Sequence, residues 1–276
     1  MIFVFKKWEK FCDDLAKCGF ISIPAKDVCA ENKGYVVLKH DVETDVEKAY
    51  AIAKIEHKYG HRGSYYVQAY LMEKQSNIKL LQEMQFWGHE ISYHYDVLDS
   101  CHGDFEKALG EFKKNCRTFE DHGFPLKTLC QHGNPIIERN GYSSNRDFFR
   151  NETVQRLYPN LSDIMVDFKV KHQTDYIYFS DAGRKFNMIF DPLTNDLVKS
   201  DDKNIPYNDL DALMRDLVDD ASYIISMHPH RWTKSAFVYK SKAICFKMIK
   251  SIAKVLVKIP FMKKIMSKYY YLAKKI

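Results

Sequence analysis

Five clusters of ionisable or hydrogen-bonding residues recur along the chain, and each directly follows a segment that is expected to form a strand. Histidine and carboxylate side chains suit zinc or a similar divalent ion, which acts as a Lewis acid and activates water. Such a centre needs about three protein ligands, an open position for water, a base and an acid. The clusters are His40-Asp41-Val42-Glu43, His94-Tyr95-Asp96, His132-Gly133, Asp181-Ala182-Gly183-Arg184 and His228-Pro229-His230.

The segments that must position these clusters alternate between strand-like and helix-like patterns. This alternation predicts a parallel sheet, open or closed into a barrel, whose strands bring the clusters together at their carboxyl ends. The expected strands are Tyr35–Lys39, Ser64–Val67, His89–Ser92, Thr128–Gln131, Asp163–Phe168, Tyr176–Phe179 and Tyr223–Met227. The expected helices run from Thr44 to a stop at Gly60, over Asn77–Phe86, over about Asp104–Asp121 and around Asp209–Asp219.

Simpler roles exist for some of these residues. Thr44-Asp-Val-Glu47 has the pattern of a capping box, so Asp41 and Glu43 could be no more than favourable charges at the start of that helix. His132 could simply begin a turn. The functional interpretation is preferred because the same residue types recur at the ends of several strands. Alternation along the strand should point His40 away from the side of Asp41.

Charge is distributed unevenly along the 276 residues, although the net charge is only +6. From Ala221 onward there are thirteen Lys and Arg and no Asp or Glu, so the first 220 residues hold 29 basic and 36 acidic groups. The acidic body argues against nucleic-acid binding, and the basic tail suits an anionic partner. The hydrophobic content of 46% indicates a folded globular protein.

The start of the chain and its cysteines favour a cytoplasmic protein. Two Lys and a Glu interrupt the apolar start, which therefore lacks the apolar core of a secretory signal. The seven Cys include no CxxC pair, as expected for reduced thiols. No uncharged apolar stretch approaches the roughly eighteen residues that a membrane span requires.

Residues 236–276 are expected to form a basic, amphipathic helical tail beside a main domain of residues 1–235. Within 244–276, a stripe of Lys at helical spacing lies beside apolar residues, a pattern typical of helices that rest on an anionic membrane surface. The alternative is a helix packed on the main domain with a solvated Lys stripe. The membrane interpretation places the protein at the inner membrane surface. The stripe is Lys247, Lys250, Lys254 and Lys258.

Five ordered motifs between residues 34 and 233 resemble those of polysaccharide deacetylase-like proteins, which are related to the NodB-homology domain of carbohydrate esterase family four. The resemblance implies a distorted (β/α)7 barrel, a divalent metal that is expected to be zinc, and hydrolysis of an N-acyl group on a sugar. The motifs are Leu38-Lys-His-Asp-Val-Glu43, Gly88-His-Glu-Ile-Ser-Tyr-His94, His132-Gly-Asn-Pro135, Tyr178-Phe-Ser-Asp-Ala-Gly-Arg184 and Ser226-Met-His-Pro-His-Arg-Trp232.

The resemblance also implies roles for individual residues. Asp41 matches the general base that takes a proton from water, and His228 matches the acid that protonates the leaving amine. Asp181 occupies a position that orients catalytic partners, where Arg184 is expected to assist it. Glu43 and His94 match metal ligands.

This sequence departs from the family pattern at two positions. The second metal histidine is usually four residues after the first, and here that position is Leu98. His132 is the first candidate to replace it as a ligand, and Asp96 is the second. Glu43 stands where relatives have Asp, which moves a carboxylate by more than about 1 Å, a scale to which catalysis is sensitive.

These observations predict a metal-dependent hydrolase that removes an N-acyl group from an amino sugar during surface-glycan assembly. The substrate would be a glycan or a lipid-linked amino sugar. A catalytically silent barrel that binds a glycan or a partner is one alternative, motivated by Leu98. The other alternative is an amidohydrolase that cleaves a small non-sugar amide with the same residues.

Overall fold

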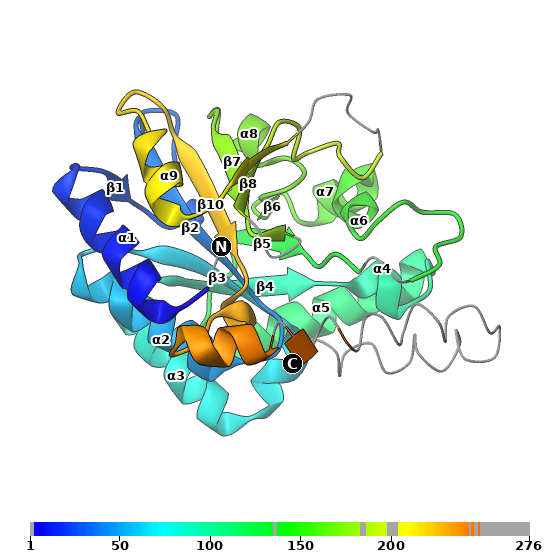
Figure 1. Cartoon of the computed structure of the whole chain (residues 1–276). Coiled ribbons are helices and arrows are strands. Elements are labelled where there is room, and N and C mark those ends of the chain that lie inside the picture. The colour runs from blue at the N-terminus through cyan, green and yellow to red at the C-terminus, as the bar shows by residue number, and fades with distance from the viewer. Residues whose placement is uncertain are drawn as a thin grey trace.

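A mostly parallel β-sheet forms the centre of a mixed α/β structure (Figure 1). The computed structural model describes residues 3–134, 137–182, 186–197, 204–242, 244, 245 and 248. Arg184, and most of the tail of residues 244–276, therefore lie outside the described residues.

Ten strands of the described chain join in one sheet. Its order is β6-β5-β4-β3-β2-β10-β7-β8-β9, with β1 paired to β2. All neighbouring pairs of strands are parallel except β7–β8 and β8–β9, which are antiparallel. The strands are β1 (Ile21–Ser22), β2 (Tyr35–Val42), β3 (Gly63–Val67), β4 (Glu90–Tyr95), β5 (Thr128–Gln131), β6 (Ser162–Asp163), β7 (Ile177–Ser180), β8 (Phe186–Ile189), β9 (Ile205–Tyr207) and β10 (Tyr223–Met227).

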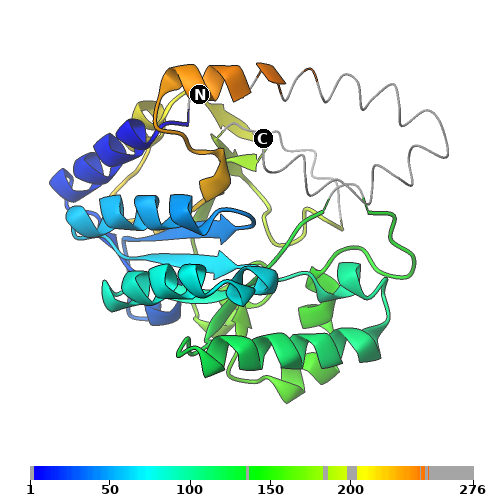
Figure 2. The ribbon, with the colours of Figure 1, turned by 90° about the horizontal axis from the view of Figure 1, so that it is seen from below.

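Helices connect the parallel strands and cover the sheet, as Figure 2 shows for α2, α3 and α5. Among the described residues, no helix has the length and apolar character needed to cross a membrane. The helices are α1 (Phe5–Lys17), α2 (Val46–Lys58), α3 (Gln75–Phe86), α4 (Val97–Ser100), α5 (Phe105–Asp121), α6 (Arg146–Arg150), α7 (Glu152–Leu157), α8 (Phe168–Lys171) and α9 (Leu210–Arg215).

Side chains of β2 alternate between two separate hydrophobic clusters. Val36 and Leu38 belong to the larger cluster, which also contains buried residues of α1, α2, α3 and α5. Tyr35 and Val37 belong to a smaller cluster on the other face of the strand. All eight residues of β2 are buried, because β3 and β10 flank the strand and both of its faces are packed. A strand buried on both faces is typical of a parallel sheet.

Helix starts and stops explain most of the element boundaries. Helix α5 begins after Asp104, whose carboxylate accepts a hydrogen bond from the amide of Lys107 at 3.1 Å, and it is followed by Gly123 at φ +83°. The prediction that Thr44 caps helix α2 was wrong. Helix α2 is capped one residue later by Asp45, whose carboxylate accepts from the Lys48 amide at 3.0 Å.

Two expected elements are shorter in the structure than the apolar pattern suggested. The expected strand Asp163–Phe168 was wrong beyond Asp163, because the Asp163 carbonyl accepts from Val166 and Asp167 and turns the chain toward α8. The helix expected around Asp209–Asp219 ends at Arg215. The antiparallel strands β8 and β9 and the short helices α6 and α7 were not predicted.

Candidate metal and acid–base site

Alternation along β2 places three charged side chains on one face of the strand and a histidine on the other. Lys39, Asp41 and Glu43 all line one cavity beyond the carboxyl ends of the strands. His40 faces the opposite way, as predicted, and its Nε2 atom lies 2.8 Å from Oε1 of the fully buried Glu56. The period of two in a strand is the cause of this division.

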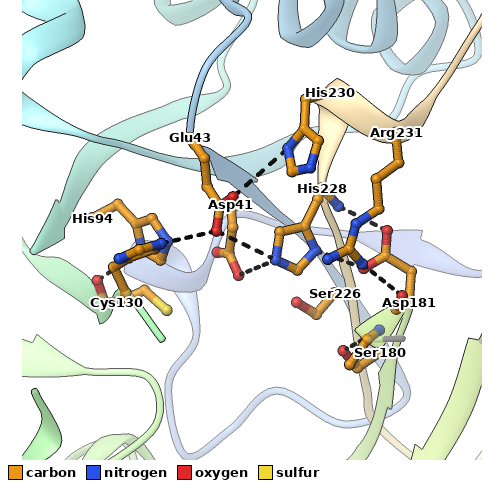
Figure 3. A network of polar contacts seen from close by, with 12 residues as sticks. Asp41, Glu43, His94, Cys130, Ser180, Asp181, Ser226, His228, His230 and Arg231 are labelled. Atoms are coloured by element: carbon orange, nitrogen blue, oxygen red, sulfur yellow. Dashed lines mark hydrogen bonds and ion pairs between the residues drawn. The ribbon is translucent and has the colours of Figure 1, made fainter. Parts of the chain in front are cut away.

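Glu43, His94 and His132 come together as one group that could hold a metal ion, and Figure 3 labels Glu43 and His94 of this group. Their ligand atoms lie within 4.8 Å of one another, and all three side chains are buried. The Nε2 atom of His132 is 3.1 Å from Oε1 of Glu43. Two imidazoles and one carboxylate form a donor set that suits zinc and leaves a position open for water.

His94 is held in the form that binds metals. Its Nδ1 atom donates to the Cys130 carbonyl at 3.0 Å, which leaves the lone pair of Nε2 free. Burial, together with the neighbouring His132 and Lys39, lowers the pKa of His94 to about 3, although Asp41 and Glu43 oppose the shift. The imidazole is therefore neutral at physiological pH.

His132 takes the place in this group that Leu98 cannot fill. Leu98 lies in α4 and packs in the larger hydrophobic cluster. His132 follows β5 instead, with its amide bonded to the Tyr95 carbonyl at 2.7 Å. The second candidate, Asp96, has its Oδ2 atom 4.0 Å from Nδ1 of His132, on the side of the ring away from Glu43.

A polar support behind His132 was missed by the sequence analysis. Asn145 donates from Nδ2 to the His132 carbonyl at 2.8 Å and to Asp99 at 2.9 Å. Arg139 contacts both carboxylate oxygens of Asp99 at 2.8 Å. These hydrogen bonds fix the loop after β5 against α4, and they connect residues too far apart in sequence for a local pattern to reveal.

A second, overlapping group could also hold a metal, and it consists of Asp41, His94 and Cys130. It is less suitable for two reasons. Both carboxylate oxygens of Asp41 are engaged by Lys39, at 2.6 and 2.7 Å. Burial also raises the pKa of the Cys130 thiol, and only the thiolate is a good metal ligand.

The Lys39–Asp41 pair fixes the charge state of Asp41. Burial alone would raise the pKa of this carboxyl group, but the charge of Lys39, together with His94 and His228, lowers it well below its usual range. Asp41 is therefore an anion across the physiological pH range. Lys39 also donates to the hydroxyl of Ser226 at 3.2 Å, which links β2 to β10.

His228, Asp181 and Arg231 form a hydrogen-bonded relay beside the metal-binding group (Figure 3). His228 Nδ1 lies 2.6 Å from Asp181 Oδ1, and Arg231 donates to the same oxygen at 2.7 Å. Burial raises the pKa of the Asp181 carboxyl group, but Arg231 and His228 outweigh this and lower it. The other ring nitrogen of His228 lies 3.9 Å from Asp41 Oδ2 and 3.8 Å from Glu43 Oε1.

Arg231 is the residue of this relay that sequence reasoning did not select. Arg184 was expected to assist Asp181, and it lies outside the described residues. Arg231 belongs to the same His-Pro-His-Arg-Trp motif as His228, so the signal was present in the sequence. His230, given no role from the sequence, has its Nδ1 atom 3.8 Å from Glu43 Oε2.

Lys39, Asp41, Glu43, His94, Cys130 and His228 line one cavity of about 210 Å³. Further lining residues come from β5, α6, β7 and the segment after β8. They are Gln131, Gly133, Arg146, Met165, Tyr178, Ser180, Ala182, Ile189 and Asn195. The cavity thus combines a metal-binding group, an ionised carboxylate and a histidine that could exchange a proton.

Comparison with protein-family models found no match, and comparison with curated proteins found none either. The resemblance to polysaccharide deacetylases therefore rests on the sequence motifs alone.

Proposed function

We propose that this protein is a metal-dependent hydrolase of the polysaccharide-deacetylase type that removes an N-acyl group from an amino sugar. The observation that carries the proposal is the position of His228 Nε2, less than 4 Å from both Asp41 and Glu43. A histidine that could donate a proton, a carboxylate that is ionised at neutral pH and a metal-binding carboxylate thus line one cavity. Amide hydrolysis requires these three functions together.

The proposal includes a distorted (β/α)7 barrel. The parallel strands β2 to β6 follow one another around the sheet, and β10 and β7 continue on the other side of β2, so a ring would close between β6 and β7. Near that gap, the Tyr176 hydroxyl, just before β7, donates to the Ile164 carbonyl, just after β6, at 3.3 Å. The smaller hydrophobic cluster also takes side chains from β2, β3, β5, β7 and β10, as the interior of a barrel does.

Glu43, His94 and His132 would hold the ion. When bound there, a divalent metal supplies a Lewis acid for the acyl oxygen and lowers the pKa of water. Asp41 accepts the proton of the attacking water, whose oxygen forms a bond to the acyl carbon. His228 donates a proton from Nε2 to the nitrogen as the carbon–nitrogen bond breaks, which releases a carboxylic acid and the free amine. Asp181 orients His228 through the contact with Nδ1, and Arg231 donates to the same carboxylate oxygen and holds it in place.

We also propose that the basic tail touches an anionic membrane surface, which would bring a lipid-linked substrate close. The described part of this region supports the idea because several of its large apolar side chains are exposed, although Tyr239 is buried. Phe237 is 80% exposed, and Ile244 and Met248 are each 60% exposed. Isolated apolar residues of this kind beside Lys suit the interface of a bilayer.

Amine release from acylated compounds tests the proposed reaction. Zinc-loaded protein is expected to deacetylate N-acetylated amino sugars and to lose turnover when the metal is chelated. His228→Ala should lower the rate by about 10²–10⁴-fold, while metal content stays unchanged. If no metal binds, the protein is a silent barrel. If only non-sugar amides are cleaved, the proposed substrate class is wrong.

A further inference from the structure

The cavity has a polar wall that the proposed reaction does not use. Arg146, the first residue of α6, and Gln131, the last residue of β5, both line it. Arg146 is only 5% exposed. A buried arginine in a cavity normally has all of its donors engaged, because an unsatisfied buried donor is unfavourable.

One nitrogen of Arg146 is fully engaged and another is not. Nη1 donates to the carbonyls of Pro192 and Leu193 at 2.8 and 3.0 Å and lies 3.2 Å from Asp196 Oδ1. In contrast, Nε is buried and has no hydrogen-bond partner within the described ranges. The Oε1 atom of Gln131 is likewise buried without one. Two unpartnered polar atoms therefore belong to side chains that line the same cavity.

Arg146 shares its ion-pair partner with a second arginine, Arg150, which also contacts Asp147 at 2.9 Å. The shared partner is Asp196, whose carboxylate contacts Arg150 at 2.8 and 2.9 Å. Guanidinium groups form their strongest hydrogen bonds with anionic oxygens. The amide of Gln131 can present either its oxygen or its NH₂ group, since the two orientations are nearly equivalent in shape.

We infer that Arg146 and Gln131 form a subsite for an anionic oxygen, of a carboxylate or a phosphate ester, on the substrate. The inference rests on the proposed function and makes it more specific, because it names acidic amino sugars as the substrate class. Arg146 and Gln131 line the same cavity of about 210 Å³ as Glu43 and His94. A single sugar unit could therefore contact both.

Arg150 provides a matched control for Arg146. Its side chain contacts the same segment, with Nη2 donating to the Leu193 carbonyl at 2.9 Å and to Asp196 at 2.8 Å. It is not among the residues that line the cavity. Arg150→Met therefore loosens the same segment without removing the unpartnered donor, whereas Arg146→Met does both.

Equilibrium binding of deacylated sugars tests the inference independently of turnover. The probes for calorimetry on the zinc-loaded protein are glucosamine, its 1-phosphate, its 6-phosphate and its 6-carboxylate. At least one anionic probe is expected to bind about 10- to 100-fold more tightly than glucosamine, the range of a hydrogen bond to a charged group. Arg146→Met and Gln131→Glu should remove that preference, and Arg150→Met should keep it. The anionic probe that binds most tightly shows whether the subsite recognises a carboxylate or a phosphate.

Two outcomes would overturn the subsite. One is equal affinity for all four probes in the unaltered protein. The other is an equal loss in Arg146→Met and Arg150→Met, which would show that the segment around Asp196 matters rather than the free donor. If the anionic preference is found but no N-acetyl sugar is deacylated, the subsite stands and the proposed reaction fails. Thermal melts of each variant establish that it is folded.

Discussion

The ammonium group of Lys39 lies 2.6 and 2.7 Å from the two carboxylate oxygens of Asp41, and both residues are buried. Two charges that are removed from water together depend on each other, because either one alone would be left buried without a counter-charge. The residue proposed as the base is thus also half of a structural ion pair. Its effects on stability and on catalysis have to be separated by experiment.

A double variant separates them. Asp41→Asn should abolish turnover with metal content nearly intact, and should lower the free energy of unfolding by about 3–5 kcal/mol, because Lys39 then lacks its partner. Adding Lys39→Met should restore most of the stability without restoring turnover. Urea denaturation and amine release measure the two quantities. Turnover in the double variant would remove Asp41 from the mechanism.

Metal content distinguishes the two overlapping ligand groups. Glu43→Gln should weaken zinc binding by at least about 10-fold, since it removes the carboxylate that lies beside His132. Cys130→Ser should leave zinc binding unchanged. Dialysis against a metal buffer followed by elemental analysis gives both values. The opposite ranking would assign the metal to the group of Asp41, His94 and Cys130.

Asp181 is expected to act through His228. Asp181→Asn removes the anion that accepts from Nδ1, so the imidazole loses its preferred tautomer and the stabilisation of its charged form. Turnover should fall by about 10²–10⁴-fold, with unchanged zinc content and little change in KM. A change in KM alone would mean that Asp181 shapes the binding site rather than the proton donor.

Three buried histidines should make the metal-free protein sensitive to acid. Burial lowers the pKa of His89 to about 4 and that of His94 and His230 to about 3. Between their ordinary pKa of about 6.5 and these lowered values, the three histidines bind protons only in the unfolded chain. The free energy of unfolding is therefore highest above about pH 6.5 and decreases as the pH falls.

Asp163 has the opposite effect, because burial raises its pKa to about 6 and the folded state then binds the extra proton. From these four groups the net difference is about two protons near pH 5, which corresponds to a loss of about 3 kcal/mol per pH unit; Glu90, whose pKa is also raised by burial, reduces this loss. Urea denaturation between pH 7 and pH 5 measures this slope. His230→Gln should reduce it by about 1.4 kcal/mol per pH unit, and an unchanged slope would show that His230 titrates normally in the fold.

The structure shows where the chain should be truncated to test whether the basic tail binds a membrane. Tyr239 is 9% exposed and its ring centroid lies 5.9 Å from that of Phe3, so a truncation near Phe237 would remove a packed residue. A chain that ends after Lys242 should keep a cooperative melt but lose salt-sensitive binding to anionic vesicles. Co-sedimentation at low and high salt is the measurement. Aggregation of that truncated chain would instead identify the tail as a packed part of the domain.

Local patterns were sufficient to predict the strands that carry the candidate site. Thr128–Gln131 and Tyr223–Met227 match β5 and β10, because short apolar runs bounded by polar residues have few alternatives. The convergence of Glu43, His94 and His132 followed from one rule of parallel sheets, which places the strand ends on the same side. These predictions required only the period of the pattern and the order of the elements.

The remaining features depend on contacts between distant residues. Lys39 looked like part of a buried strand, and only the spacing of 2.6 Å to Asp41 identifies it as the partner of that carboxylate. Arg231 was passed over because its hydrogen bonds to Asp181 join distant parts of the chain, which a local motif does not show. The cap at Asp45 rather than Thr44 shows the same limit on a smaller scale, since both residues are good caps and tertiary packing decides between them.

The fully buried carboxylate of Glu56, behind the sheet, accepts hydrogen bonds from Trp8 at 3.2 Å and Tyr65 at 2.7 Å and pairs with His40. Strand β2 is thus held by polar partners on both faces: His40 against Glu56 on one and Lys39 with Asp41 on the other. A slip of β2 by one residue would turn each of these side chains to the wrong side and leave charges buried and unpaired on both. Misaligned pairings of β2 during folding would therefore be penalised twice, and the strand that carries the candidate site would have a single permitted alignment.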